Sequence, residues 1–238
     1  MTAIFKKDLR SYFHSMQSFI YLSLFAVFCG YYACKQITMP SVDGGGASST
    51  LLSGMCSSVA FLLPLITMRS FAGERIRRTE RLVLTAPIGP LSVAFGKFLA
   101  CAAVAAISLL PASILPFIIT CMGYLSFGEF FLVLLGCLVF SFAVAALGVF
   151  VSSMCLTPMG SYFGTAGILI VFWMAGNILP NLGSSTLRAL LSSLALFEAP
   201  AIFSYGILRY STILYLLSFA AICILLCAKS LDLERRTR

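Results

Sequence analysis

Long apolar blocks with almost no charges run through this sequence, and they constrain its fold more than any other feature. Only 10% of the 238 residues are charged, whereas 60% are hydrophobic. A soluble domain of this size carries about 25% charged residues and places its apolar residues in stripes along helices. The hydrocarbon core of a bilayer, about 30 Å thick, instead requires about 20 consecutive apolar residues per helix. The sequence therefore predicts an integral membrane protein.

The apolar blocks predict an all-α fold with six transmembrane helices. The predicted spans cover residues 18–35, 51–69, 91–121, 129–154, 160–180 and 211–228. Pro111 and Pro116 are expected to kink the third span, because proline removes a helical hydrogen bond. Residues 181–210 are less apolar and are expected to form short external helices. The whole chain, 1–238, is expected to form a single transmembrane domain.

Residues 1–17 are amphipathic. Apolar side chains such as Leu9 and Tyr12 recur at helical spacing, with basic residues such as Lys6, Lys7 and Arg10 between them. A helix of this kind lies in the membrane surface, with its charged side toward the lipid headgroups. The segment predicts an interfacial helix before the first span.

The basic residues gather on one side of the predicted membrane. Thirteen of the sixteen Lys and Arg residues fall in the N-terminal segment, in residues 69–97 and in the C-terminal tail. Cytoplasmic loops carry an excess of Lys and Arg, so both termini and the 69–97 region are expected to be cytoplasmic. The net charge of +8 fits this topology and anionic lipids, and no nucleic-acid partner is expected.

The sequence offers few residues for chemistry inside the membrane. His14, the single histidine, precedes the first span, and no pair of acidic residues lies within a span. A Ser–His dyad, a pair of catalytic carboxylates and a histidine-bound metal are therefore not expected. The nine cysteines include no CxxC pair and predict neither disulfides nor a metal site. We expect a non-enzyme without cofactors, in which Glu198 is a candidate for an external gate.

The strongest internal cluster of charges lies between the second and third predicted spans. Residues 74–81 mix acidic and basic side chains, and Leu82, Val83 and Leu84 follow them. A helix with mixed charges and one apolar side suits a polar groove on a cytoplasmic protein better than lipid. An ordinary basic loop between spans is the alternative.

This region resembles the signature of ABC-2 type permeases. The matching residues are Leu82–Pro87, with the sequence Leu-Val-Leu-Thr-Ala-Pro, and Gly96 followed by Lys97 at the start of the third span. The resemblance implies that residues 70–86 form a coupling segment that docks on an ATPase subunit. The contact residues that it implies are Glu74, Arg75, Arg78, Glu80 and Arg81.

A second resemblance lies before the last span. Residues 203–215 contain a Phe-x-x-Gly pattern followed by apolar residues. This pattern is similar to the branch of the family associated with gliding motility and nitrous-oxide reductase. With the span count and the N-terminal helix, the likeness extends over nearly the whole chain.

The resemblance implies the permease subunit of an ABC exporter in the bacterial inner membrane. ATP and Mg²⁺ would bind a separate ATPase subunit, since the stretch from Gly89 to Lys97 has six residues between its glycines where a phosphate loop needs four. A second permease copy or a homologous permease would complete the complex. ATP-driven closure would move residues 70–86 and hence spans one, two and five.

Two other functions remain open from the sequence. One is a mechanotransmitting complex that acts on an extracytoplasmic partner without a wide channel. The other is a channel or secondary transporter, for which the spans offer few ionisable residues. Neither the cargo nor the choice between homodimer and heterodimer is readable from these residues.

Overall fold

The computed structural model describes residues 2–38, 46–76, 89–123, 125–178, 196–197, 200, 203 and 209–237. Within these ranges the fold is all-helical and contains no strand. Six helical segments are long and apolar enough to cross a membrane. The predicted fold class, an all-α protein with six candidate spans, is confirmed. The region between spans five and six lies mostly outside the described residues.

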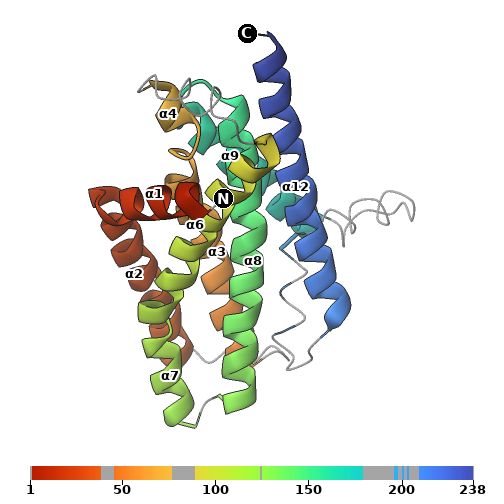
Figure 1. The fold of residues 1–238 in the computed structure, drawn as a ribbon. Helices are drawn as coiled ribbons and strands as arrows, with labels where there is room; N and C mark the ends of the chain where they lie inside the picture. Colours follow the sequence, from red (N-terminus) through yellow and green to blue (C-terminus); the bar gives the residue numbers. More distant parts are fainter. Residues whose placement is uncertain are drawn as a thin grey trace.

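The helices form an elongated bundle (Figure 1). In chain order they are α1 (Thr2–Phe13), α2 (Met16–Thr38), α3 (Gly46–Thr67), α4 (Ala72–Ile76), α6 (Pro90–Ala112), α7 (Ile114–Cys121), α8 (Phe127–Met154), α9 (Pro158–Ile178) and α12 (Tyr210–Thr237). The N-terminal helix α1 lies across the bundle, while α2 runs along it. This arrangement agrees with the interfacial helix predicted for the N-terminus.

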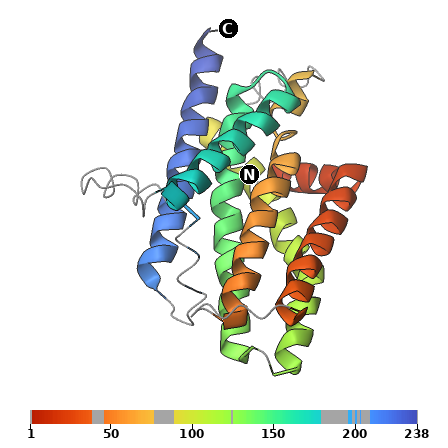
Figure 2. The ribbon, with the colours of Figure 1, turned by 180° about the vertical axis from the view of Figure 1, so that it is seen from behind.

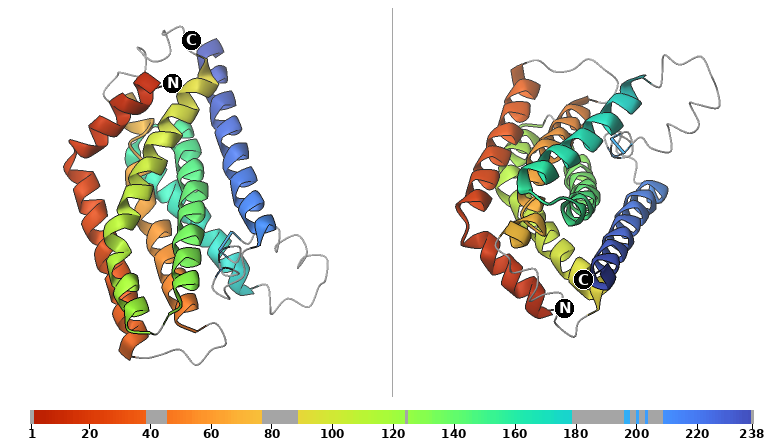
Figure 3. Two further views of the ribbon diagram at one scale, coloured as in Figure 1. Left: turned by 60° about the horizontal axis from the view of Figure 1, so that its bottom comes forward. Right: turned by 90° about the horizontal axis from the view of Figure 1, so that it is seen from above.

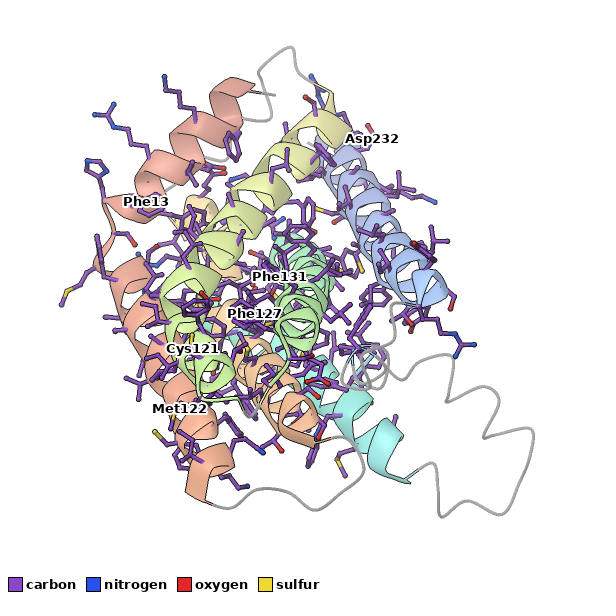
Figure 4. The ribbon with its side chains drawn as sticks, turned by 90° about the horizontal axis from the view of Figure 1, so that it is seen from below. Phe13, Cys121, Met122, Phe127, Phe131 and Asp232 are labelled. Atoms are coloured by element: carbon purple, nitrogen blue, oxygen red, sulfur yellow. The ribbon has the colours of Figure 1, made fainter. Side chains whose placement is uncertain are left out.

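One end of the bundle carries the start of α1 and the end of α12 (Figure 3). The helix α4, the start of α6 and the end of α8 lie at this same end (Figure 1). We call it the terminal end. At the opposite end, Cys121 and Met122 close α7, and Phe127 and Phe131 open α8 (Figure 4).

The central helix is α8. It packs against α3, α6, α9 and α12, and Gly136, Ala143 and Ala146 are among its buried small residues. Small residues let helix backbones approach closely, which is the usual basis of packing between membrane helices. The approach is tightest at Gly148, where an added Cβ would lie 2.8 Å from the Cβ of Thr67 on α3.

Local sequence signals fix the ends of α8. At its start Ser126 and Glu129 form a capping box: the Glu129 N–H donates to Ser126 Oγ, and the Ser126 N–H donates to Glu129 Oε2, each at 3.3 Å. At its end a short connection leads to Pro158, the first residue of α9. Thr157 caps α9 by accepting a hydrogen bond at Oγ1 from the Gly160 N–H at 3.2 Å.

The third candidate span is interrupted between its two inner prolines. Helix α6 ends at Ala112 and α7 begins at Ile114, with Ser113 between them. Pro111 and Pro116 lack the N–H groups that would donate to carbonyls four residues earlier. The interruption follows from these two missing hydrogen bonds.

Helix α9 crosses the back of the bundle, over α3 and α8 (Figure 2). In the most apolar 18-residue stretch of α9 only 17% of the residues are buried, compared with 67% in the corresponding stretch of α8. Phe163, Val171 and Trp173 are among its exposed large side chains. An apolar surface of this extent faces either lipid or another apolar protein surface.

Candidate coupling site

The candidate site begins where α3 turns into α4 at the terminal end. The N–H of Ser70 donates to the Thr67 carbonyl at 3.0 Å, and the N–H of Glu74 donates to the Phe71 carbonyl at 3.0 Å. The chain therefore makes a tight turn over residues 68–71 and starts α4 at Ala72. This helix is the described part of the predicted coupling segment 70–86.

The structure describes only some of the residues predicted for sites. Glu74 and Arg75 lie on α4. The remaining candidates lie outside the described residues: Arg78, Glu80, Arg81 and the possible external gate Glu198.

A serine of the central helix caps α4. The N–H groups of Phe71 and Ala72 donate to Ser152 Oγ at 3.1 and 3.2 Å. The Ser152 hydroxyl in turn donates to the Met68 carbonyl at 3.4 Å. The first N–H groups of a helix have no partner within the helix, so a side-chain oxygen here satisfies them. Ser152 is fully buried, and it fixes the start of α4 against the end of α8.

A buried lysine ties α4 to two other helices. Lys97 Nζ, near the start of α6, lies 2.8 Å from Glu74 Oε2 and 3.4 Å from Asp8 Oδ2 of α1. It also donates to the Ser70 carbonyl at 2.7 Å. The Lys97 side chain is only 2% exposed. We call Lys7, Asp8, Glu74 and Lys97 the ionic cluster.

The ionic cluster contains two positive and two negative side chains. Lys7 Nζ lies 3.2 Å from Glu74 Oε1, and the Lys7 side chain is 62% exposed, so Lys7 is on the solvent side of the cluster. Burial raises the pKa of Asp8 above its usual value, although the positive charge of Lys97 opposes the shift. The Lys97 ammonium also lies 4.9 Å from the centre of the Phe71 ring, where a cation–π interaction is favourable.

Arg75 makes a second contact between α4 and the end of α8. One of its guanidinium nitrogens donates to the Cys155 carbonyl at 3.1 Å. Cys155 is the C-cap of α8. The last carbonyls of a helix lack partners within it and attract positive charge, so an arginine is well placed there.

The interfacial helix has a further attachment to α6. The Tyr12 hydroxyl and Cys101 Sγ are 3.4 Å apart. Burial raises the pKa of Tyr12 well above its usual value, so the phenol stays neutral. Together with the Lys97–Asp8 pair, this contact holds α1 along the first half of α6.

The Glu74 side chain is mostly buried within the ionic cluster. Its side chain is 16% exposed and contacts both Lys7 and Lys97. Ile76, at the end of α4, is in contrast 62% exposed. The described part of the segment thus has an inner side, which holds Glu74 and Arg75, and an exposed end at Ile76.

Three residues of this site are not predicted as site members from the sequence: Asp8, Lys97 and Ser152. Lys97 had a signal, because it is a single charge among Phe95, Gly96 and Phe98 in the first turns of an apolar helix. Asp8 and Ser152 had none, because their roles depend on segments more than 60 residues away.

The rest of the described chain offers an apolar cavity and no metal cluster. Within the described ranges, no group of three His, Cys, Asp or Glu residues is placed to hold a metal ion. A cavity of about 240 Å³ lies between α2, α3 and α9, and its lining includes Tyr32, Phe61 and Trp173. Lys97, the one buried charged side chain in the described ranges, lies instead at the terminal end.

Comparison with known protein families agrees with the sequence resemblance. A family model described as ABC-2 family transporter protein matches residues 2–189. The match includes α1 to α9 and all members of the ionic cluster. No curated protein matches the chain.

Proposed function

Since this chain belongs to the ABC-2 family of transporter proteins, and is thus the permease component of an ABC transporter, we propose that it serves an ATP-driven exporter. In this proposal ATP and Mg²⁺ bind a separate ATPase subunit, and this chain performs no catalysis. Hydrolysis in the ATPase moves the coupling segment 70–86, and the bundle passes the motion to the cargo pathway.

The construction of α4 is the observation that supports ATPase coupling best. The helix is only five residues long, yet it is attached to α8 through Ser152 and Arg75 and to α6 and α1 through Lys97. A force applied to the segment that follows Ile76 therefore reaches several membrane helices directly. A loop that merely connected two spans would not need these attachments.

The proposed orientation places the terminal end in the cytoplasm of a bacterial cell, at the inner membrane. Of the Lys and Arg residues in the described ranges, all but Lys35 and Arg209 belong to segments at the terminal end. The excess of Lys and Arg on the cytoplasmic side supports this orientation. The ATPase would then approach α4 from the cytoplasm.

The proposed complex contains two permeases. The exposed apolar side of α9, with Phe163 and Trp173, offers a surface for a second copy or a homologous permease. Two permeases with an ATPase on each would give the complex two equivalent coupling segments.

The test is copurification with charge reversal in the coupling segment. The tagged chain is co-expressed with the proteins of neighbouring genes, purified in mild detergent, and assayed for vanadate-sensitive ATP hydrolysis. We expect a stoichiometric ATPase subunit with the wild type and its loss with Arg78→Glu plus Arg81→Glu. Arg235→Glu, which reverses an exposed charge in the tail, is the matched control and is expected to keep the ATPase.

Two results would contradict the proposal. A stable wild-type chain that elutes without any ATPase would favour a channel or secondary carrier. An ATPase that binds the double charge reversal as well as it binds the wild type would remove the coupling role of residues 70–86. The thermal midpoint of each variant, measured in the same detergent, shows whether the chain is folded.

A further inference from the structure

Lys97 differs from the other charged residues that the structure describes, because it alone is fully buried. A buried ammonium is costly unless it is paired and hydrogen-bonded, and a lysine in an apolar helix is otherwise a poor choice. Its presence near the start of α6 therefore needs a specific reason.

The surroundings of Lys97 match the capacity of an ammonium group. An ammonium has three N–H donors and no acceptor. Lys97 Nζ has three oxygen partners within 3.4 Å: Asp8 Oδ2, the Ser70 carbonyl and Glu74 Oε2. Each partner comes from a different segment, namely α1, the turn before α4, and α4 itself. The three donors are thus used to join three segments to α6.

The contacts of α4 with α8 are of a different kind. The hydrogen bonds of Ser152 Oγ to the backbone of Phe71 and Ala72 involve neutral groups. Arg75 pairs with a neutral carbonyl and is only partly buried. A bond between neutral groups can be replaced by water when a segment moves, whereas separating Lys97 from Glu74 leaves opposite charges unpaired in an apolar site.

We propose that Lys97 is a positioning residue that joins α1, α4 and the start of α6 into one moving unit. The inference rests on the proposed coupling function, and it names the helices that move together with α4. When the ATPase displaces α4, the Lys97 contacts make the third span and the interfacial helix follow. Without them α4 would keep its contacts with α8 and the pair with the exposed Lys7, and the third span would not follow.

The far end of the same span offers a natural reporter. Cys121 ends α7, which continues α6 after the interruption at Ser113, and its thiol is exposed. Motion of the third span changes the surroundings of Cys121, which closes α7 at the end of the bundle seen in Figure 4, whereas Lys97 is in the first turns of α6 at the terminal end. The rate at which a maleimide labels Cys121, measured by mass spectrometry of its peptide, therefore reports whether displacement reaches the far end.

The test compares this labelling rate in the purified complex with its ATPase, with and without vanadate trapping in the presence of ATP and Mg²⁺. The key variant is Lys97→Met with Asp8→Asn, which removes one charge of each sign, keeps the ionic cluster neutral and leaves Glu74 of the coupling segment unchanged. Lys6→Met, on the exposed side of α1, is the control that removes one lysine from outside the cluster. The single variant Lys97→Met is also made, since it leaves an excess of buried negative charge and can fail to fold.

We expect trapping to change the Cys121 labelling rate in the wild type and in Lys6→Met. In the balanced double variant we expect this response to be lost, while the ATPase still copurifies and the thermal midpoint stays close to that of the wild type. A purely structural lysine would instead lower the thermal midpoint and leave the trapping response of the folded fraction intact.

Two outcomes overturn the inference while the proposed function stands. One is a bound, active ATPase with no trapping response at Cys121 in the wild type. The other is an unchanged response in the balanced double variant. Absence of a bound ATPase from the wild type, by contrast, contradicts the proposed function itself, so the two failures are distinguishable.

Discussion

At the residue scale, the ionic cluster shows that two carboxylates beside one ammonium are not equivalent. Glu74 has two lysine partners, at 3.2 and 2.8 Å. Asp8 has the longer contact of 3.4 Å with Lys97, and burial raises its pKa. Burial stabilises the neutral form of a carboxyl group, whereas a near cation stabilises the charged form. For Asp8 the effect of burial is the larger one.

The raised pKa of Asp8 predicts that the stability of the folded protein depends on pH through this residue. A carboxyl whose pKa is higher in the folded than in the unfolded chain contributes stability that is complete below the unfolded value, near 3.8, and is lost as the pH rises through the folded value. We therefore expect the stability of the wild type, relative to Asp8→Asn, to fall as the pH is raised from about 3.8 towards neutrality.

The measurement is the thermal midpoint of both proteins in detergent across this pH range. The difference between the two proteins isolates Asp8, because the other titrating groups are common to both. A difference that stays constant with pH, or that changes in the opposite direction, would contradict the assignment.

At the element scale, the contact between α8 and α3 has little spare room. An added Cβ at Gly148 would lie 2.8 Å from Thr67 Cβ and 3.0 Å from Thr67 Cγ2. Thr67 is the last residue of α3, just before the turn into α4. The close approach therefore sets the position from which the coupling segment leaves the bundle.

Gly148→Ala is expected to destabilise the protein by about 1–3 kcal/mol, the usual cost of overpacking. It should also shift the start of α4, because the methyl group pushes on Thr67. Gly128→Ala lies in the same helix, where an added Cβ meets nothing within 4 Å, and it should be close to neutral. Thermal unfolding of both variants checks the prediction, and equal effects would contradict the packing argument.

At the scale of the whole molecule, the uneven burial of the helices indicates where a second permease can bind. Only 17% of the most apolar stretch of α9 is buried, whereas α8 packs against α3, α6, α7, α9 and α12. If α9 faces a second copy, cysteines placed on its exposed side will crosslink between copies. We expect Val171→Cys to give a covalent dimer on oxidation in membranes.

Leu214→Cys is the matched control, because both side chains are apolar and similarly exposed, 64% for Val171 and 68% for Leu214. The wild type, which has nine cysteines of its own, supplies the background. Crosslinking at Leu214 and not at Val171 would place the interface on α12 instead.

The sequence was sufficient for the features that depend on local composition. Six apolar blocks predicted six candidate spans, and the spacing of Leu9 and Tyr12 predicted the amphipathic N-terminal helix. The site was harder to predict, because it is built by tertiary contacts. Asp8, Glu74 and Lys97 look like unrelated charges at segment ends until the fold brings both carboxylates within 3.4 Å of the Lys97 ammonium. Glu74, for which the resemblance predicts a contact with the ATPase, also pairs with Lys7 of α1 and Lys97 of α6.

The three N–H donors of Lys97 all have partners, and this affects how the terminal end can move. Because all three ammonium hydrogens have partners and the side chain is 2% exposed, no water is at hand to replace a partner that drifts away. Small displacements of α4 relative to α6 therefore meet a steep rise in energy, and gradual sliding is disfavoured. We therefore expect the contacts of Lys97 to separate together in one step, and not one after another.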